Sequence, residues 1–252
     1  MQGVVPAAGE GTRLRPLTAE RPKGLVDVAG KPLLTHVFET LVSLGVTELV
    51  VVVGYRADDI REHYDNSFEG TPITYVEQTE RRGLGHAVLQ AEPVVDGDFV
   101  VLNGDNVCRA NTDAVVDRHH ETDADATLLV ESVSRDRASE GGVIDHDDGA
   151  VEGLVEKPDD PPSTLIPRGF FTLSTAIFRA LHAVQPGHTG EVELTRAIDR
   201  LVQAGRRVET VALSGWCVNV NTDADRETVA AKLADDAAST INDLSADSDS
   251  QA

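Results

Sequence analysis

Lysine is scarce in this sequence of 252 residues: there are only four lysines, and arginine supplies the rest of the 22 basic residues. Acidic residues number 43, so the formal net charge is -21. A surface this negative argues against nucleic acid as a partner, because phosphate groups would be repelled. An acidic, lysine-poor composition instead indicates adaptation to high salt, where charges are screened over only ~3 Å at about 1 M.

Cysteine and long apolar runs are scarce as well. Cys108 and Cys217 lie far apart and lack C-x-x-C spacing, so we expect neither a zinc site nor a disulfide, but two small buried residues. No apolar run reaches the ~18 residues that a membrane span needs. The N-terminus has no basic region followed by a signal-like cleavage site. We therefore expect a cytoplasmic protein without a membrane partner.

The first half of the chain alternates between strand-like and helical patterns. Its length suits one large α/β domain with a sizeable core. A β-α-β-α order of this kind predicts an open parallel sheet with helices on both faces. We predict strands at residues 2–8, 48–54, 73–77, 98–103 and 126–133, and helices at residues 33–44, 58–64, 84–92 and 112–121.

The second half is less regular. We predict one domain over residues 1–240, followed by an Asp/Ser-rich tail at 241–252 that we expect to be disordered. His119-His120, Asp123, Asp125 and the segment 145–148 could suggest metal clusters, but they lie on a predicted helix end and in turns and are interpreted as solvated acidic surface. Predicted strands lie at residues 142–145, 150–156, 169–173 and 208–213, and predicted helices at 176–184, 193–204 and 223–238.

A glycine-rich loop follows the first strand and leads into a cluster of cations. Gly9 and Gly11 allow backbone N–H groups to approach phosphate oxygens, and such concave loops bind anions. Arg13, Arg15 and Lys23 then supply positive charge for a polyphosphate. Within the first 31 residues, five basic residues face only three acidic ones, against the trend of the whole chain. This layout predicts a nucleoside triphosphate site.

Two other phosphate motifs do not fit this loop. A P-loop places Gly-Lys-Ser/Thr directly before a helix, whereas Lys23 comes after two prolines. A dinucleotide fingerprint needs a third glycine, and Leu14 occupies that position while Pro16 blocks a long helix. A lone G-x-G would indicate an ordinary strand-to-helix loop, but the attached Thr-Arg-Leu and Pro-Lys segments make that interpretation poor.

The run G-x-G-T-R-L-x-P-L-T-x-x-x-P-K-x-L-x-x-V-x-x-K-P, from Gly9 to Pro32, resembles the opening of the sugar-1-phosphate nucleotidyltransferases, or NDP-sugar pyrophosphorylases. The motifs are nearest to those of glucose-1-phosphate uridylyl- and thymidylyltransferases. The resemblance implies a Rossmann-like α/β fold: a three-layer α/β/α sandwich with a mostly parallel, mixed central sheet. It further implies a nucleotide-binding half at about 1–110 and a sugar-binding half at about 111–240.

The resemblance also implies roles for the residues of the opening loop and of a later segment. Arg13 would hold the leaving pyrophosphate, and Lys23 would bridge the two reacting phosphates. His86, next to the base-binding segment, is interpreted as structural rather than as a catalytic acid. The nucleotide-binding residues implied in this way are Ala8, Gly9, Gly11, Thr12, Gln78 and Gly83, of which Gln78 would pair with the base.

A magnesium ion is the implied cofactor. Asp105 follows a buried strand, and ligands of open α/β sheets lie at the carboxyl ends of strands. Mg²⁺ typically takes one or two carboxylates together with phosphate oxygens and water. The resemblance assigns Asp105 as the first metal ligand. The second comes from a late motif that departs from the family pattern, and Asn219 is our choice, with Asn221 or Asp223 as alternatives.

The segment Val155-Glu156-Lys157-Pro158 matches the sugar-phosphate motif of the family. Lys157 would bind the sugar phosphate, Glu156 a sugar hydroxyl, and Gly142 would approach the sugar. One departure is the segment Pro167-Arg168-Gly169, which stands where the family often has Asn-Ala-Gly before an aromatic strand. An asparagine that helps to hold the sugar is therefore missing, and the identity of the sugar stays open.

The reaction that these residues imply joins a nucleoside triphosphate to a hexose 1-phosphate and releases pyrophosphate. UTP and glucose 1-phosphate are the favoured substrates, and dTTP is the next choice of nucleotide. Two alternatives stay open: a nucleotidyltransferase for a non-sugar acceptor such as phosphocholine, and a non-catalytic regulatory homologue. The implied partners are the two substrates, and self-association into a homo-oligomer is left open.

Overall fold

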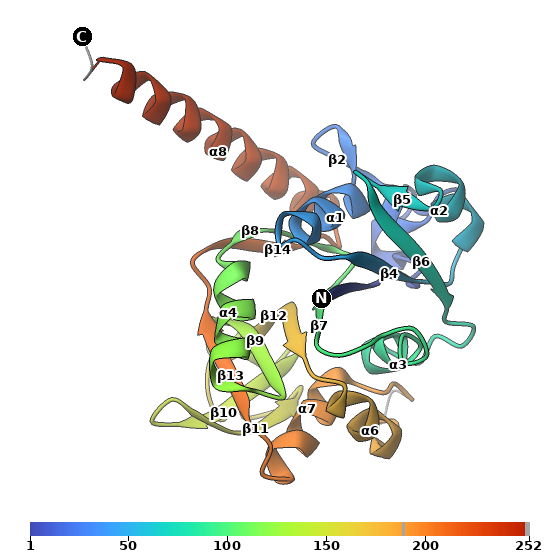
Figure 1. The fold of residues 1–252 in the computed structure, drawn as a ribbon, viewed down its shortest axis with the longest axis vertical. Coiled ribbons are helices and arrows are strands. Elements are labelled where there is room, and N and C mark those ends of the chain that lie inside the picture. Colours follow the sequence, from blue (N-terminus) through green and yellow to red (C-terminus); the bar gives the residue numbers. More distant parts are fainter. Residues whose placement is uncertain (188–189, 250–252) are drawn as a thin grey trace.

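The computed structural model describes residues 1–187 and 190–249, with side chains described as far as Ser239. Its centre is an eight-stranded sheet in the order β13-β9-β12-β7-β1-β4-β6-β5 (Figure 1). These strands are β1 (Gln2–Pro6), β4 (Glu48–Val53), β5 (Ser67–Phe68), β6 (Thr71–Glu77), β7 (Phe99–Leu102), β9 (Ala126–Ser132), β12 (Leu165–Leu173) and β13 (Val208–Ala212).

The central sheet is mixed. β1 pairs in parallel with both β4 and β7, and β4 pairs in parallel with β6. β12 runs antiparallel to both of its neighbours, β7 and β9, and β5 runs antiparallel to β6. A near-continuous apolar run such as Leu49 to Val53 is fully buried, as expected of a strand covered on both faces. The predicted mostly parallel, mixed sheet is therefore confirmed.

Helices cover both faces of this sheet. Side chains of α1 (Leu33–Ser43), α2 (Ala57–Tyr64) and α4 (Thr112–Thr122) pack on one face with Val5, Val51 and Val53. Side chains of α3 (Leu84–Leu89), α6 (Ala176–Ala183) and α7 (Leu194–Gln203) pack on the other with Val4 and Val52. Successive residues of one strand thus enter two different cores, which confirms the predicted three-layer sandwich.

Several short elements escaped prediction. They are η1 (Thr12–Leu14), η2 (Lys23–Leu25), β2 (Asp27–Val28), β3 (Lys31–Pro32), β8 (Asn106–Ala110), α5 (Arg135–Ala138) and β14 (Gly215–Asn219). The predicted pair of short strands in the second half is present as β10 (Gly142–Asp147) and β11 (Ala150–Glu156). The expectation of a solvated surface is wrong for His119, which is buried with 1% of its surface exposed and lies 3.2 Å from the Thr127 hydroxyl.

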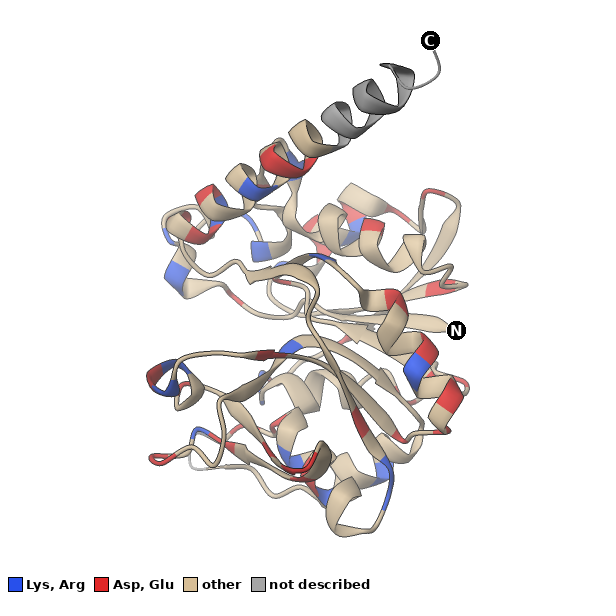
Figure 2. Cartoon of the chain, turned by 90° about the vertical axis from the view of Figure 1, so that its left-hand side faces the viewer, with Lys and Arg blue, Asp and Glu red and all other residues tan. Residues whose placement is uncertain are grey.

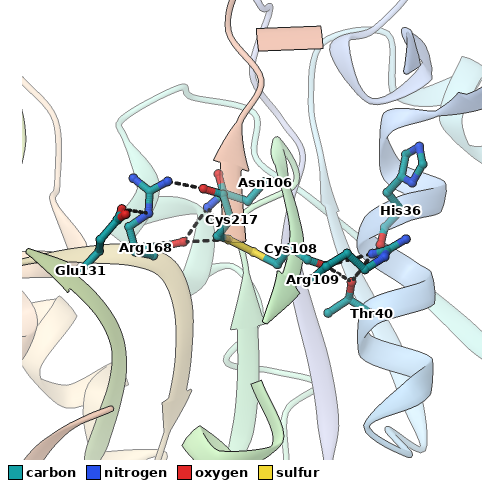
Figure 3. The surroundings of a disulfide bond; sticks show 8 residues. All are labelled: His36, Thr40, Asn106, Cys108, Arg109, Glu131, Arg168 and Cys217. Carbon is teal, nitrogen blue, oxygen red and sulfur yellow. Dashed lines mark hydrogen bonds and ion pairs between the residues drawn. A yellow bond between two sulfur atoms is a disulfide. The ribbon is translucent and has the colours of Figure 1, made fainter. Parts of the chain in front are cut away.

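The pair formed by β8 and β14 corrects one of our expectations. Cys217 lies directly opposite Cys108 in this antiparallel pair, and the two form a disulfide (Figure 3). The expected absence of a disulfide is therefore wrong, whereas the expected burial of both residues is confirmed, with 1% and 4% of their surface exposed. Sequence spacing missed the bond because neither strand was predicted, and because 109 residues separate its ends.

The last helix, α8 (Asp223–Asp249), extends away from the body of the molecule (Figure 1). It runs past residue 238, its predicted end, and its backbone includes most of the segment at 241–252 for which we expected disorder. No proline or glycine follows Gly215 in the sequence, so nothing in the composition ends the helix early. Residues 250–252 lie outside the described residues. No helix in the described part of the chain combines the length and apolar character that a bilayer would require.

The disulfide generates a testable expectation. Unfolding the protein in denaturant without reductant should reveal no free thiol, whereas reduction should reveal two, the full cysteine content. Because the bond closes a loop of 109 residues, its reduction should lower the free energy of unfolding by about 2–4 kcal/mol. Thiol titration and urea unfolding measure the two effects. A Cys108→Ser variant serves as a control with one thiol under either condition, and two reactive thiols in the unreduced parent would contradict the assignment.

Candidate active site

The cavity that holds most of the predicted site residues, called the main cavity below, lies where the strand order changes direction. β1 has β4, the next strand of this sheet along the chain, on one side and β7 on the other. Open α/β sheets bind ligands at such a point, outside the carboxyl ends of the strands. The N–H of Gly104 donates to the carbonyl of Pro6 (3.0 Å), so the loops after β7 and β1 meet. The cavity measures about 550 Å³, and its lining includes Ala7, Ala8, Gly9, Gly11, Thr12, Arg13, Lys23, Gln78, Arg81, Gly83, Asn103, Asp105, Asn219 and Asn221.

The loop after β1 is built around Gly11. Gly11 has a φ of 63°, in the left-handed region, and a Cβ there would lie 2.9 Å from the Cβ of Lys23. The Thr18 hydroxyl donates to the Gly11 carbonyl (2.8 Å) and holds the turn. Glycine is thus required at this position both for the backbone conformation and for the close approach of Lys23.

Lys23 connects the two loops electrostatically. Its Nζ lies 2.7 Å from Asp105 Oδ2 and 2.9 Å from Asn221 Oδ1. The side chain of Lys23 is only 12% exposed and that of Asp105 is 28% exposed. A partly buried ion pair of this kind is screened less than a surface pair, so it fixes the ammonium beside the glycine-rich loop.

Asn221 forms hydrogen bonds with several residues of the site. Its Oδ1 accepts from Arg13 Nη2 (2.9 Å) as well as from Lys23, and its Nδ2 donates to Asn219 Oδ1. The backbone N–H of Asn221 donates to Asp225 Oδ2 (2.9 Å). Burial raises the pKa of Asp225, but hydrogen bonds from Asn221 and Thr222 outweigh it, so the net pKa is lowered and this residue remains a carboxylate.

The candidate metal ligands differ in their positions and contacts. Asp105 and Asn219 both line the cavity, and they come from the adjoining ends of β8 and β14, where Asn219 pairs with Asn106. Asp223 instead bonds Arg226 and has a 68% exposed side chain. Within the described residues, no cluster of three or more His, Cys, Asp and Glu side chains could hold a metal by itself. One carboxylate and an amide oxygen fit an ion such as Mg²⁺, which completes its shell with phosphate oxygens and water.

At the other end of the cavity, Gln78 is nearly buried, with 5% of its surface exposed. Its Nε2 lies 3.1 Å from the Gly83 carbonyl and 3.0 Å from His86 Nδ1. Gly83 has a φ of 91°, and a Cβ there would lie 3.0 Å from the Val192 carbonyl. Desolvation by burial lowers the pKa of His86, and the charge of Arg82 lowers it further. This histidine is therefore neutral near pH 7.

The residues expected to bind the sugar phosphate form a second group. Gly142 pairs with Glu156 across β10 and β11, and the Lys157 N–H donates to the Gly141 carbonyl (2.8 Å). The Thr195 hydroxyl donates to Glu156 Oε2 (2.6 Å). The structure brings these three predicted residues together, but they do not line the main cavity, which contains the other ten.

Arg168, which belongs to the departure from the family pattern, does not line the main cavity. Its Nε lies 3.1 Å from Glu131 Oε2, and its Nη2 donates to the Cys217 carbonyl (Figure 3). Burial lowers the pKa of Arg168, and Glu131 counters this effect. The guanidinium of Arg168 therefore links β12 to β9 through an ion pair and to β14 through a hydrogen bond.

Sequence reasoning missed several residues that line the cavity, and two of them, Asn221 and Arg81, contact side chains of the glycine-rich loop. Asn221 was considered only as an alternative metal ligand, although it contacts both Arg13 and Lys23. Arg81 lines the cavity and pairs with Glu10. Arg81 could have been predicted to line the cavity, because it is a basic residue close to Gln78 in a chain with few basic residues. Nothing in the sequence signalled the role of Asn221, because its partners lie about 200 positions away.

Comparisons with known proteins agree with this geometry. The chain is 48% identical over 234 residues to the UTP–glucose-1-phosphate uridylyltransferase AglF of Haloferax volcanii, covering 92% of this chain and 96% of that protein. It is 36% identical to a glucose-1-phosphate thymidylyltransferase of Streptomyces antibioticus, covering 89% of this chain and 64% of that protein.

Among solved structures, a UTP-bound UGPase from Acinetobacter baumannii matches with a TM-score of 0.80 and 26% identity, covering 91% of each chain. A UDP-glucose pyrophosphorylase complexed with UDP-glucose has the same fold, with a TM-score of 0.83 and coverage of 93% and 98%. A family model described as nucleotidyl transferase matches residues 2–219, which include both β1 and the Asn219 end of the cavity. The chain therefore belongs to the nucleotidyl transferase family.

Proposed function

We propose that this protein transfers a uridylyl group from UTP to glucose 1-phosphate, forming UDP-glucose and pyrophosphate. The observation that carries the proposal is the convergence of two cations, Arg13 and Lys23, on one oxygen position beside Asp105. Such an arrangement suits a polyphosphate at the carboxyl ends of β1 and β7. The uridylyltransferase that is 48% identical to this chain supports the choice of substrates.

The proposed chemistry is an in-line displacement. An oxygen of the sugar phosphate attacks the α-phosphorus and forms a new P–O bond, while the bond to the pyrophosphate oxygen breaks and its electrons leave with pyrophosphate. The nucleophile is already an anion, so no general base is needed. Catalysis then consists of positioning and charge neutralisation. Arg13 would hold the departing pyrophosphate, and Lys23 would neutralise charge on the α-phosphate.

The remaining assigned residues complete the proposal. Ala8, Gly9, Gly11 and Thr12 would present backbone and hydroxyl groups to the triphosphate, and Gln78 and Gly83 would hold the base. Gly142, Glu156 and Lys157 would receive the sugar phosphate. Asp105 and Asn219 would hold Mg²⁺, which neutralises phosphate charge when bound.

Asn221 would act as a neutral spacer between the two phosphate-binding cations. Its Oδ1 accepts from Arg13 and Lys23 at 2.9 Å each, a position comparable to that of a phosphate oxygen. A carboxylate there would form two ion pairs and compete with the substrate. An amide holds the two cations without cancelling their charge.

A Lys23→Met variant tests the central assignment. It should lower kcat by about 10²–10³-fold, because a fixed donor for the reacting phosphates is lost. The measurement is pyrophosphate release from UTP and glucose 1-phosphate with Mg²⁺. Lys232→Met is the matched control, since Lys232 lies over the Trp216 ring and does not line the cavity. Full activity of the Lys23 variant would refute its assigned role.

Asn221→Asp tests the neutral spacer. Affinity for pyrophosphate, measured by calorimetry without metal, should fall about tenfold or more, because the new negative charge repels the ligand. A repulsion of only about 1.4 kcal/mol corresponds to a tenfold loss of affinity. Asn221→Gly removes the amide but adds no charge, so it should lose less affinity than Asn221→Asp. Asn66→Asp introduces the same charge at an exposed position outside the cavity. Equal affinity in the Asn221→Asp and Asn66→Asp variants would contradict the idea.

We further propose a halophilic, cytoplasmic enzyme. Acidic and basic residues are interspersed along the chain (Figure 2). Because the net charge is -21, however, repulsion between negatively charged side chains destabilises the compact folded state. Raising KCl from about 0.1 M to about 2 M screens this repulsion, so the melting temperature should rise. Thermal unfolding at a series of salt concentrations measures the effect. A melting temperature that falls with salt would mean that lost surface ion pairs outweigh the relief of repulsion.

A further inference from the structure

The amide of Gln78 presents only one kind of group to the cavity. Its Nε2 lies 3.1 Å from the Gly83 carbonyl and 3.0 Å from His86 Nδ1, so each of its two protons has an acceptor when Nδ1 is unprotonated. No hydrogen bond from the described residues reaches the other end of this amide, Oε1. Since Gln78 lines the cavity, this oxygen is the polar atom that remains for a ligand. Gln78 is thus a hydrogen-bond acceptor toward the substrate.

The orientation of an amide is assigned from its partners, and here two partners agree. Flipping the amide would bring Oε1 against the Gly83 carbonyl, where two acceptors would repel. It would also require a proton on His86 Nδ1. Gln90 approaches the other ring nitrogen of His86 at 3.4 Å, which is longer than the 3.0 Å contact of Gln78. Gln90 Nε2 also donates to the His86 carbonyl at 3.1 Å, so it does not need the ring nitrogen as an acceptor. We therefore assign the tautomer from the shorter contact, with Nδ1 unprotonated and Nε2 carrying the proton.

We infer that His86 is a positioning residue that selects the nucleobase: its Nδ1 holds the Gln78 amide with the oxygen toward the cavity. His86 itself does not line the cavity, so it acts through Gln78. The inference rests on the proposed function, in which Gln78 meets the base. Because desolvation by burial keeps the pKa of His86 low, the neutral ring persists near pH 7.

An acceptor at this position discriminates between pyrimidines. Uracil and thymine carry a ring N3–H donor, which matches Gln78 Oε1. Cytosine carries an N3 acceptor at the same place, so two acceptors would face each other without a proton between them. A buried polar group left unpaired costs enough to change affinity by about 10- to 100-fold. The device therefore selects uracil or thymine against cytosine, and it does not separate UTP from dTTP.

The test compares the dissociation constants of UTP and CTP in the parent, His86→Ala and His86→Asn. The parent should prefer UTP by about 10- to 100-fold. His86→Ala removes one of the two partners of Nε2, so the preference should shrink by roughly tenfold, within the range for one lost hydrogen bond. His86→Asn places an acceptor oxygen one bond beyond Cγ, where Nδ1 is in histidine, and should restore the preference.

Binding is measured without turnover, so the inference and the proposed function fail separately. A parent that binds UTP selectively but releases no pyrophosphate with any sugar 1-phosphate refutes the proposed reaction and leaves the role of His86 intact. An unchanged UTP:CTP ratio in a folded His86→Ala variant overturns the inference. Equal loss of UTP and CTP affinity in both variants also overturns it, since a purely structural histidine would behave in that way. Circular dichroism establishes that each variant is folded.

Discussion

The junction of β1 and β7 is the constraint on which the site depends. These strands are parallel neighbours, so their carboxyl ends open at the same edge of the sheet. The hydrogen bond from the Gly104 N–H to the Pro6 carbonyl then joins the loops that follow them. Through this junction, Lys23 from one loop reaches Asp105 from the other at 2.7 Å. Without the parallel pairing, the cations and the carboxylate would lie on unrelated parts of the surface.

The pair of β8 and β14 supplies the other wall of the site. β8 begins directly after Asp105, and β14 ends at Asn219, so their antiparallel register brings these two residues to one end of the pair. The Cys108–Cys217 bond and the Arg168 contact with the Cys217 carbonyl hold β14 against β8 and β12 (Figure 3). Asn221, two residues further on, is thereby placed between Arg13 and Lys23.

Much of this arrangement could be predicted from local sequence, and the part that could not depends on long-range pairing. Apolar runs such as Val50 to Val53 indicated buried strands, and the glycine-rich loop with Lys23 indicated a phosphate site. β8 and β14 are short and half polar, so their strand character depends on each other rather than on their composition. The disulfide and the role of Asn221 follow from that pairing, and neither has a local signal.

Amide side chains supply hydrogen-bond acceptors in the site without adding negative charge. A protein with a net charge of -21 that binds two polyanions cannot add carboxylates freely around the phosphates. Among the described residues, Asp105 is the carboxylate in ion-pair contact with Lys23, and Asp225 interacts with Lys23 electrostatically without a hydrogen bond. The acceptor that Lys23 shares with Arg13 is the amide of Asn221, which in turn donates to the amide of Asn219. In the proposed function, Gln78 would likewise present an amide oxygen to the base. Amides fix geometry by donating and accepting at once, and they would leave the positive charge of Arg13 and Lys23 available to the proposed substrates.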